Sequence, residues 1–412
     1  MDAGLTPSPA PEFRKSRNSA SFGPELAGTK SPLKRLTTDT FTIIDGVFAM
    51  ATYLLTGGAG FIGRHLCREL LARGHQVRVI DSLVSQVHGG RPPALPPEVE
   101  FYEGGLRETQ LLDVALDGAD GVFHLAAEVG VGQSMYEIVR YVGGNDLATA
   151  YLLERLAENP VRRLVVASSM SVYGEGWYMS ADRVPVAVRR NLAEGWDPLG
   201  PDGAPLAPLP TDETKPVDLA SIYALGKYVQ ERSCLMIGRA YGVETVALRL
   251  FNVFGPGQAL SNPYTGVLAN FGARLLHGEP PLVFEDGRQQ RDFVHVRDVA
   301  RAFAAAMEAD GVDGEVINVG SGRAYAIADV ATMLAAAMGR PEIAPEIIGK
   351  ARAGDVRHCF ADIAKAERLL GFRAAEPLED SLDELSAWIA ASSAEDLGLH
   401  ARSQLESRGL VA

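Results

Sequence analysis

Apolar and polar residues alternate in blocks from Ala51 onward, and the blocks predict strands and helices in turn. Short runs rich in β-branched residues predict buried strands. Between them, GRHLCRELLARG and NDLATAYLLERLAE have the apolar spacing of amphipathic helices. This alternation is typical of the α/β class, and it predicts a doubly wound parallel sheet with helices on both faces. The strand-like runs are YLLTG, QVRVIDS, EFYEG, GVFHLAA, RLVVASS and TVALRLFNV.

Beyond the last of these strands the loops lengthen and alanine-rich helices such as VRDVARAFAAAMEA follow. We therefore expect a sheet domain over 50–255 and a smaller lobe mainly over 256–390, with some segments returning to the sheet. Residues 391–412 form a polar tail. Residues 1–49 are rich in Pro, Ser and Thr and lack apolar periodicity, so we expect them to be a disordered extension.

One long insertion interrupts the sheet domain. Residues 175–216 contain Trp177, Trp196 and seven prolines, and they predict a long irregular loop. Because the insertion follows the carboxyl end of a strand, it could cover the bound ligand. It could equally be a surface excursion that packs on the second lobe, and the sequence leaves both interpretations open.

Composition excludes several classes of function. The chain has 412 residues, with 39 Lys and Arg against 52 Asp and Glu, so its formal charge of −13 argues against nucleic-acid binding and anionic membranes. No apolar run reaches the length of a membrane span. Cys67, Cys234 and Cys359 are far apart and the histidines lack metal-site spacing, so we expect no disulfide framework and no metal. A reducing, cytoplasmic location fits this cysteine usage.

A glycine-rich turn joins the first strand to the first helix. Gly58, Gly60 and Gly63 satisfy the G-x-G-x-x-G dinucleotide fingerprint in the required strand–turn–helix context. The first glycine is expected to allow the tight turn, the second the approach of the pyrophosphate, and the third the close packing of helix on strand. The amino end of the helix would then face the phosphates.

Asp81 ends the second strand, where a carboxylate accepts hydrogen bonds from the adenosine ribose. The same carboxylate would repel a 2′-phosphate, and no arginine follows it closely, so we expect NAD rather than NADP. The alternative is an aspartate that merely caps the strand end. The sheet domain is therefore interpreted as a Rossmann-type, NAD-binding domain.

Tyr223 and Lys227 are four residues apart in a predicted helix, which places both on one face. A nearby ammonium group stabilises a phenolate and lowers its pKa, which base catalysis by tyrosine requires. Ser169 ends the strand RLVVASS, where its hydroxyl could hold the same substrate oxygen. Chance occurrence of Y-x-x-x-K in a surface helix is the alternative.

Together these motifs resemble the extended short-chain dehydrogenase/reductase family, in the group of NAD-dependent nucleotide-sugar epimerases and dehydratases. The likeness covers Ala51 to about Ala375, and its motifs follow the order of the family. Its carriers are TGGAGFIG (56–63), Asp81, HLAA (124–127), Asn145, SSMSVYG (168–174), Tyr223, Lys227, RLFNVFGPGQ (249–258), RDFVHVRDVA (291–300), NVGSG (318–322) and GDVRHCFADIAKAERLLGF (354–372).

The resemblance implies a role for each matching residue. Tyr223 would be the base for the sugar 4-hydroxyl, Lys227 would also bind the nicotinamide ribose, and Ser169 would bond the reacting oxygen. The second lobe would bind the nucleotide-sugar substrate. The residues implied to bind this substrate are Asn252, Arg291, Arg352 and Asp355. Those implied to bind the cofactor are Gly57, Gly58, Gly60, Phe61, Ile62, Gly63, Asp81, Leu125, Ala126, Ala127, Asn145, Tyr223 and Lys227.

Two features depart from the family pattern. The third strand ends in Gly104-Gly105, whereas the family often has Gly-Asp with the aspartate on the adenine. Ser169 and Tyr223 are 54 residues apart, which exceeds the usual separation because of the insertion.

The residues after Ser169 bear on the reaction. The family's sugar dehydratases carry Asp-Glu where this chain has Met170 and Ser171, and related decarboxylases keep a Glu at the second position. Neither residue here does proton chemistry at neutral pH, so elimination is disfavoured. What remains is 4-epimerisation, in which hydride is removed at carbon 4 and returned to the other face of a 4-keto intermediate.

Three segments narrow the resemblance further, to dTDP-L-rhamnose 4-epimerases, which make dTDP-6-deoxy-L-talose. They are AAEVGVGQSMYEI (126–138), the insertion and QALSNPYTGV (258–267). The alternatives are a UDP-hexose or UDP-uronate 4-epimerase, a one-way dehydrogenase or reductase, and a non-catalytic NAD-binding regulatory or scaffold protein.

The family also implies a homodimer that pairs the helices around 143–158 and 219–241. Apolar residues on these helices permit such pairing, but they suit burial against the sheet equally well. These residues include Leu152, Leu153, Leu156, Leu235 and Ile237.

Overall fold

The computed structural model describes residues 50–90, 95–260, 262, 264, 266–392, 396 and 398–411. The expectation of disorder over 1–49 lies outside these residues. No described helix is long and apolar enough to cross a lipid bilayer.

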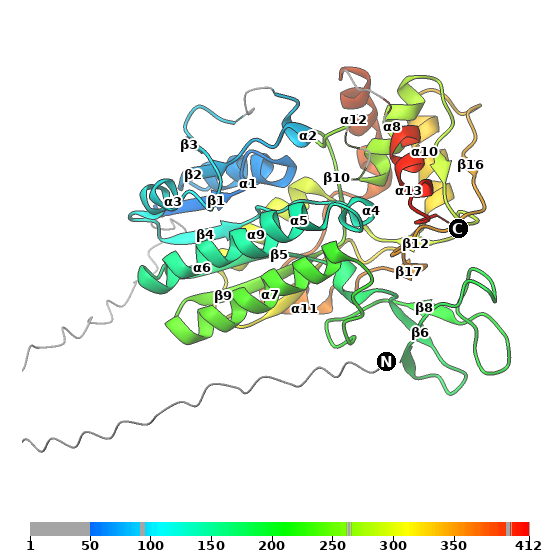
Figure 1. Ribbon diagram of the computed structural model, residues 1–412, viewed down its shortest axis with the longest axis horizontal. Helices are drawn as coiled ribbons and strands as arrows, with labels where there is room; N and C mark the ends of the chain where they lie inside the picture. Colours follow the sequence, from blue (N-terminus) through cyan, green and yellow to red (C-terminus); the bar gives the residue numbers. More distant parts are fainter. Residues whose placement is uncertain are drawn as a thin grey trace, which may run out of the picture. The chain divides into compact units, whose positions relative to one another are not determined.

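A seven-stranded sheet forms the centre of the fold (Figure 1). All neighbouring strands are parallel and run in the order β14-β9-β5-β4-β1-β2-β3. This confirms the predicted α/β class and doubly wound sheet. The strand order reverses between β1 and β4, which is the switch point where open parallel sheets bind ligands. The strands are β1 (Thr52–Thr56), β2 (Gln76–Asp81), β3 (Glu100–Glu103), β4 (Gly121–His124), β5 (Arg163–Ser169), β9 (Glu244–Leu250) and β14 (Val316–Val319).

Helices cover both faces of the sheet, each over its own apolar core. One core joins the sheet to α1, α9 and α11, and the other joins it to α3, α6 and α7. Leu152, Leu153 and Leu156 are buried in the second of these cores, so they pack against the sheet and are not available for pairing with a second copy. The bounds are α1 (Phe61–Ala72), α3 (Thr109–Leu116), α6 (Ala148–Glu158), α7 (Ile222–Tyr241), α9 (Val296–Glu308) and α11 (Ala364–Leu370).

A separate apolar core lies among α8, α10 and α12. The short strands of this part of the chain form two pairs and one three-stranded sheet, and the pair β10 and β13 runs parallel. These elements are α8 (Val267–Leu276), α10 (Ile327–Ala337), α12 (Leu378–Ala390), β10 (Asn252–Phe254), β13 (Phe293–His295), β11 (Leu282–Val283), β16 (Glu346–Ile347), β12 (Gln290–Arg291), β15 (Tyr325–Ala326) and β17 (His358–Cys359).

The insertion is more regular than its prolines predict. It contains a three-stranded antiparallel sheet of β6 (Trp177–Met179), β7 (Pro185–Ala187) and β8 (Ala207–Leu209). The expectation of an irregular loop is therefore wrong over these strands. Distant partners hold the insertion in place: the buried Arg357 guanidinium binds Asp197 at 2.7 Å, and the Arg357 amide donates to Glu175 at 2.7 Å. Such contacts depend on residues far away in the chain, which local sequence patterns do not report.

Short helical segments complete the fold, and the tail contributes one of them. Ala401 and Leu405 of α13 are buried, and the Arg408 guanidinium carbon lies 4.3 Å from the centre of the Tyr136 ring. The tail therefore packs on the sheet domain's loops. The segments are α2 (Ser85–His88), α4 (Val131–Ser134), α5 (Ile138–Tyr141), the π-helical η1 (Val142–Leu147), the 3₁₀-helical η2 (Met170–Tyr173) and α13 (Gly398–Glu406).

Candidate active site

A large cavity of about 2030 Å³ opens at the carboxyl ends of the sheet strands. Its walls come from the loops after β1, β2 and β4, from α7, and from the connection between β10 and α8. Most of the predicted cofactor ligands line it, together with Ser169 and Asn252. Those cofactor ligands are Gly57, Gly60, Phe61, Ile62, Gly63, Asp81, Leu125, Ala126, Ala127, Tyr223 and Lys227.

The glycine turn has the close packing that the fingerprint predicts, but the structural roles of its glycines differ from the predicted ones. The left-handed backbone needed for the turn occurs at Gly57, whose φ is +68°, and not at Gly58. A Cβ on Gly58 would lie 2.7 Å from Val79 Cγ2, so packing against the neighbouring strand requires that glycine. A Cβ on Gly63 would lie 2.5 Å from Gly58 Cα, so α1 packs tightly against the turn that follows β1.

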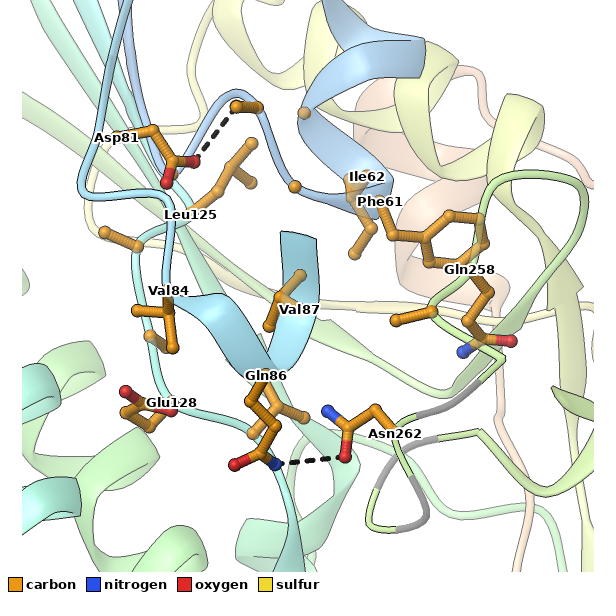
Figure 2. A pocket seen from close by; sticks show the side chains of 18 of the residues that line it. Phe61, Ile62, Asp81, Val84, Gln86, Val87, Leu125, Glu128, Gln258 and Asn262 are labelled. Carbon is orange, nitrogen blue, oxygen red and sulfur yellow. Dashed lines mark hydrogen bonds between the residues drawn. The ribbon is translucent and has the colours of Figure 1, made fainter. Parts of the chain in front are cut away.

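Asp81 both supports the turn and faces the cavity (Figure 2). Its Oδ2 accepts a hydrogen bond from the Ala59 amide at 3.1 Å, and its Oδ1 accepts one from the Leu83 amide at 2.9 Å. The capping role that the sequence left as an alternative therefore coexists with a position on the cavity wall. A carboxylate held in this way is fixed where an adenosine ribose would meet it.

Tyr223 and Lys227 lie in the first turns of α7, which Ser221 caps through a hydrogen bond from the Ala224 amide at 3.1 Å. The Tyr223 amide donates to Ser134 Oγ at 3.0 Å, which ties the start of α7 to α4. Lys227 Nζ donates to the Ala167 carbonyl at 2.9 Å. Side-chain and backbone contacts thus fix both residues beside the end of β5.

Burial is the main cause of the pKa shifts of Tyr223 and Lys227. Burial raises the pKa of Tyr223, and the side chain of Ser169 lowers it by hydrogen bonding. Burial also lowers the pKa of Lys227 to about 8. The pKa of Tyr223 is therefore shifted in the direction opposite to the one expected from a neighbouring ammonium group alone.

Among the predicted substrate-binding residues, Asn252 lines the cavity and has a polar atom that a ligand could bind. It begins β10 and lines the cavity, and its Oδ1 is buried without a hydrogen-bond partner among the described residues. A buried amide oxygen of this kind normally has a partner. A ligand hydroxyl or amide in the cavity would supply it.

The structure does not bring Arg291, Arg352 and Asp355 into the cavity lining. The Arg291 guanidinium donates to the carbonyls of Arg357, at 3.0 Å, and of Val356. Arg352 Nε pairs with Asp355 at 2.7 Å. Both arginines already have internal partners, and those of Arg291 are 65 and 66 residues away, so sequence spacing could not reveal them.

Asn145 also lies behind the cavity wall and not on it. Its Oδ1 accepts from the Glu128 amide at 2.6 Å, and its Nδ2 donates to the Glu128 carbonyl at 3.1 Å. The residue belongs to η1, and single-turn π-helices often occur near functional sites. Asn145 thus holds in place the loop that carries the lining residues Leu125 to Ala127.

Several lining side chains escaped the sequence analysis: Arg64, Gln86, Glu128, Arg140 and Asn262. Arg64 follows the last fingerprint glycine directly, and Glu128 and Asn262 lie in the segments 126–138 and 258–267 that carry the family resemblance. Gln86 and Arg140 had no such signal, and no spacing links the five residues.

The acidic side chains of the lining are all engaged. Besides Asp81, Glu108 accepts from the Gly105 amide at 2.8 Å, and Glu128 pairs with Arg140 at 2.8 Å. No described lining residue comes from the insertion. The insertion contacts the residues around β17 and does not line this cavity.

Comparisons with known proteins agree with this geometry. A model described as the NAD dependent epimerase/dehydratase family matches residues 53–320. A dTDP-L-rhamnose 4-epimerase of Burkholderia thailandensis is 35% identical over 348 residues, which covers 82% of this chain and 94% of that relative.

Solved structures show the same similarity. A UDP-glucose 4-epimerase of Thermotoga maritima with UDP-glucose is 31% identical, with a TM-score of 0.69, covering 82% of this chain and 99% of that one. A Thermus thermophilus UDP-glucose 4-epimerase complexed with NAD is 30% identical, with a TM-score of 0.67, covering 83% and 100%. The chain belongs to the NAD-dependent epimerase/dehydratase family and is an NAD-dependent epimerase of nucleotide sugars.

Proposed function

We propose that this enzyme inverts carbon 4 of its nucleotide sugar by removing and returning hydride within one bound complex. The observation that carries the proposal is the meeting of Ser169, Tyr223 and Lys227 on one wall of the cavity that the glycine turn and Asp81 also line. NAD, when bound, supplies the hydride acceptor.

The side chains divide the proton chemistry. Tyr223, as its phenolate, takes the proton from the sugar 4-hydroxyl while Ser169 bonds the same oxygen, and the nearby Lys227 ammonium stabilises that phenolate. The C4–H bond breaks, a C4=O double bond forms, and the proton stays on Tyr223. Return of hydride to the other face of carbon 4 draws that proton back to the oxygen. Lys227, held by the Ala167 carbonyl, places its charge beside the phenol during both steps.

The residues next to Ser169 favour epimerisation over elimination. Met170 and Ser171 form the start of η2, and the Ser171 amide donates to Ser169 Oγ at 3.2 Å. Neither side chain carries an acid or base for removing water or carbon dioxide. Hydride transfer alone needs only the groups that are present.

For the substrate we propose dTDP-L-rhamnose, with dTDP-6-deoxy-L-talose as the product. The supporting observations are the segment 126–138, which resembles dTDP-L-rhamnose 4-epimerases, and the 35% identity to the Burkholderia thailandensis enzyme. UDP-hexoses and UDP-uronates are the second candidate. The solved relatives favour it, among them a Bacillus cereus UDP-glucuronic acid 4-epimerase that is 28% identical, with a TM-score of 0.66.

Purified protein incubated with dTDP-L-rhamnose in heavy water, without added cofactor, tests the proposal. We expect a new chromatographic peak of unchanged mass, because the transferred hydrogen returns to carbon without exchange. Deuterium on carbon would contradict internal hydride return. Absence of a new peak would remove dTDP-L-rhamnose, and UDP-glucose and UDP-glucuronic acid would be tested next. Tyr223→Phe protein is the matched negative control.

A further inference from the structure

Two side chains from opposite walls of the cavity meet at its edge (Figure 2). Gln86 lies in α2, shortly after the strand that ends in Asp81, and Asn262 lies in the connection between β10 and α8. Gln86 Nε2 donates to Asn262 Oδ1 at 3.1 Å. The bond joins residues 176 positions apart, so it links the cofactor side of the cavity to the segment that follows Asn252.

Gln86 is itself the centre of a polar network. It forms a reciprocal amide pair with Gln133, with both N···O distances at 3.1 Å. Its Oε1 also accepts from Arg140 Nη1 at 2.6 Å. Glu128 and Glu137 hold the Arg140 guanidinium at 2.8 Å and 3.0 Å.

Asn262 is anchored as well, and the residue is 2% exposed. Its Oδ1 accepts a second hydrogen bond from the Tyr264 amide at 3.2 Å, and the Tyr136 hydroxyl donates to Tyr264 Oη at 2.7 Å. Both sides of the Gln86–Asn262 bond are therefore preorganised.

The weak point of this closure is α2. It is four residues long and has no buried residue, so little apolar packing holds it. Val84 and Val87 face the cavity instead. Among the described residues, the Gln86–Asn262 hydrogen bond joins α2 to the opposite wall, and such a bond can open and close.

We propose that Gln86 and Asn262 form a clasp that retains NAD in its cavity between the two hydride transfers. The inference rests on the proposed function, because an enzyme that reuses the same cofactor needs it to stay while the ketone turns. Gln86 is a positioning residue here: it acts by holding α2 closed against Asn262.

The test measures cofactor release and needs no sugar. Protein loaded with NADH is mixed with excess NAD, and the loss of bound-NADH fluorescence gives the release rate. We expect Gln86→Ala and Asn262→Ala each to release NADH about tenfold faster than the natural protein. Because the two side chains share one bond, the double variant should be scarcely faster than either single variant.

Gln76→Ala is the matched control, since Gln76 is exposed on β2 and bonds Thr52 outside the cavity. Release rates within twofold of this control for both variants would overturn the clasp. Should Gln86→Ala not fold, Asn262→Ala on the other wall decides the question alone. If the variants release NADH faster but the natural protein does not convert the sugar, the clasp stands and the proposed function fails. If the natural protein converts the sugar but the variants release NADH at the control rate, the proposed function stands and the clasp fails.

Discussion

At the scale of single residues, burial decides the properties of the proposed catalytic groups. The pKa of Tyr223 is raised and that of Lys227 is lowered to about 8, so both groups favour their neutral forms more than in water. Lys227 keeps hydrogen-bond partners in the Ala167 carbonyl and Gln230 Oε1, at 2.9 Å and 3.1 Å. Lys227 Nζ is therefore held at the end of β5 by two hydrogen bonds.

Tyr223→Phe should abolish proton transfer while leaving the fold intact, because only the hydroxyl is lost and its amide still bonds Ser134. We expect kcat to fall by about 10²–10⁴-fold, the usual contribution of a general base. NADH release should match that of the natural protein. A variant with at least a tenth of the natural kcat would show that another group is the base.

At the scale of elements, the contact between α1 and the glycine turn that follows β1 has no spare room. A side chain added at Gly63 would collide with the backbone of Gly58 and not with a flexible side chain, so the start of α1 would have to move. That helix start carries the cavity-lining residues Phe61 and Ile62.

Gly63→Ala should therefore weaken NAD binding at least tenfold and lower the free energy of unfolding by about 1–3 kcal/mol, the typical cost of overpacking. Gly143→Ala is the control, because Gly143 also lines the cavity but has open space where its Cβ would lie. Calorimetric titration with NAD and urea unfolding measure the two effects. Equal NAD affinity in both variants would contradict the packing argument.

At the scale of the whole molecule, apolar side chains remain exposed on η1 and α7. Leu147 is 45% exposed, Leu225 43% and Met236 58%. These are not the leucines that the sequence offered for dimerisation, of which Leu152, Leu153 and Leu156 are buried in the core. We propose that a second copy of this chain covers this surface, because apolar side chains left exposed on two neighbouring elements favour association.

A charged residue at Met236 should prevent that pairing. We expect the natural protein to be dimeric at micromolar concentration and Met236→Glu to be monomeric by light scattering. Val114→Glu, at a 57% exposed position on α3, should remain dimeric. A monomeric natural protein would remove the homodimer proposal.

Acid sensitivity is also a property of the whole molecule. Burial lowers the pKa of His124 to about 3 and those of His295 and His358 to about 4. The unfolded chain therefore binds more protons than the folded protein below the ordinary pKa of 6.5, so stability falls as pH drops from 6.5 toward 4.

Each histidine should contribute up to about 1.4 kcal/mol per pH unit in that window. Urea unfolding at pH 7 and pH 5 measures the loss, and His295→Gln should reduce it. An equal unfolding free energy at the two pH values would contradict the burial argument.

Local sequence determined much of this protein. The strand–glycine–helix turn, the Y-x-x-x-K helix and the serine at the end of β5 are short motifs, and neighbouring residues along the chain specify their geometry. The alternation of apolar runs and amphipathic segments likewise predicted the parallel sheet. Strands that are buried on both faces have continuous runs of apolar residues.

Tertiary structure decided the contacts between distant segments. The Gln86–Asn262 bond, the carbonyl partners of Arg291 and the strands of the insertion all depend on residues that meet only after folding. The exposed apolar surface on α7 was decided in the same way, since a helix has several apolar positions and the packing of its neighbours selects which remain uncovered. A local sequence pattern indicates backbone preference and hydrophobic periodicity. Which side chains contact one another depends on their proximity in the folded protein.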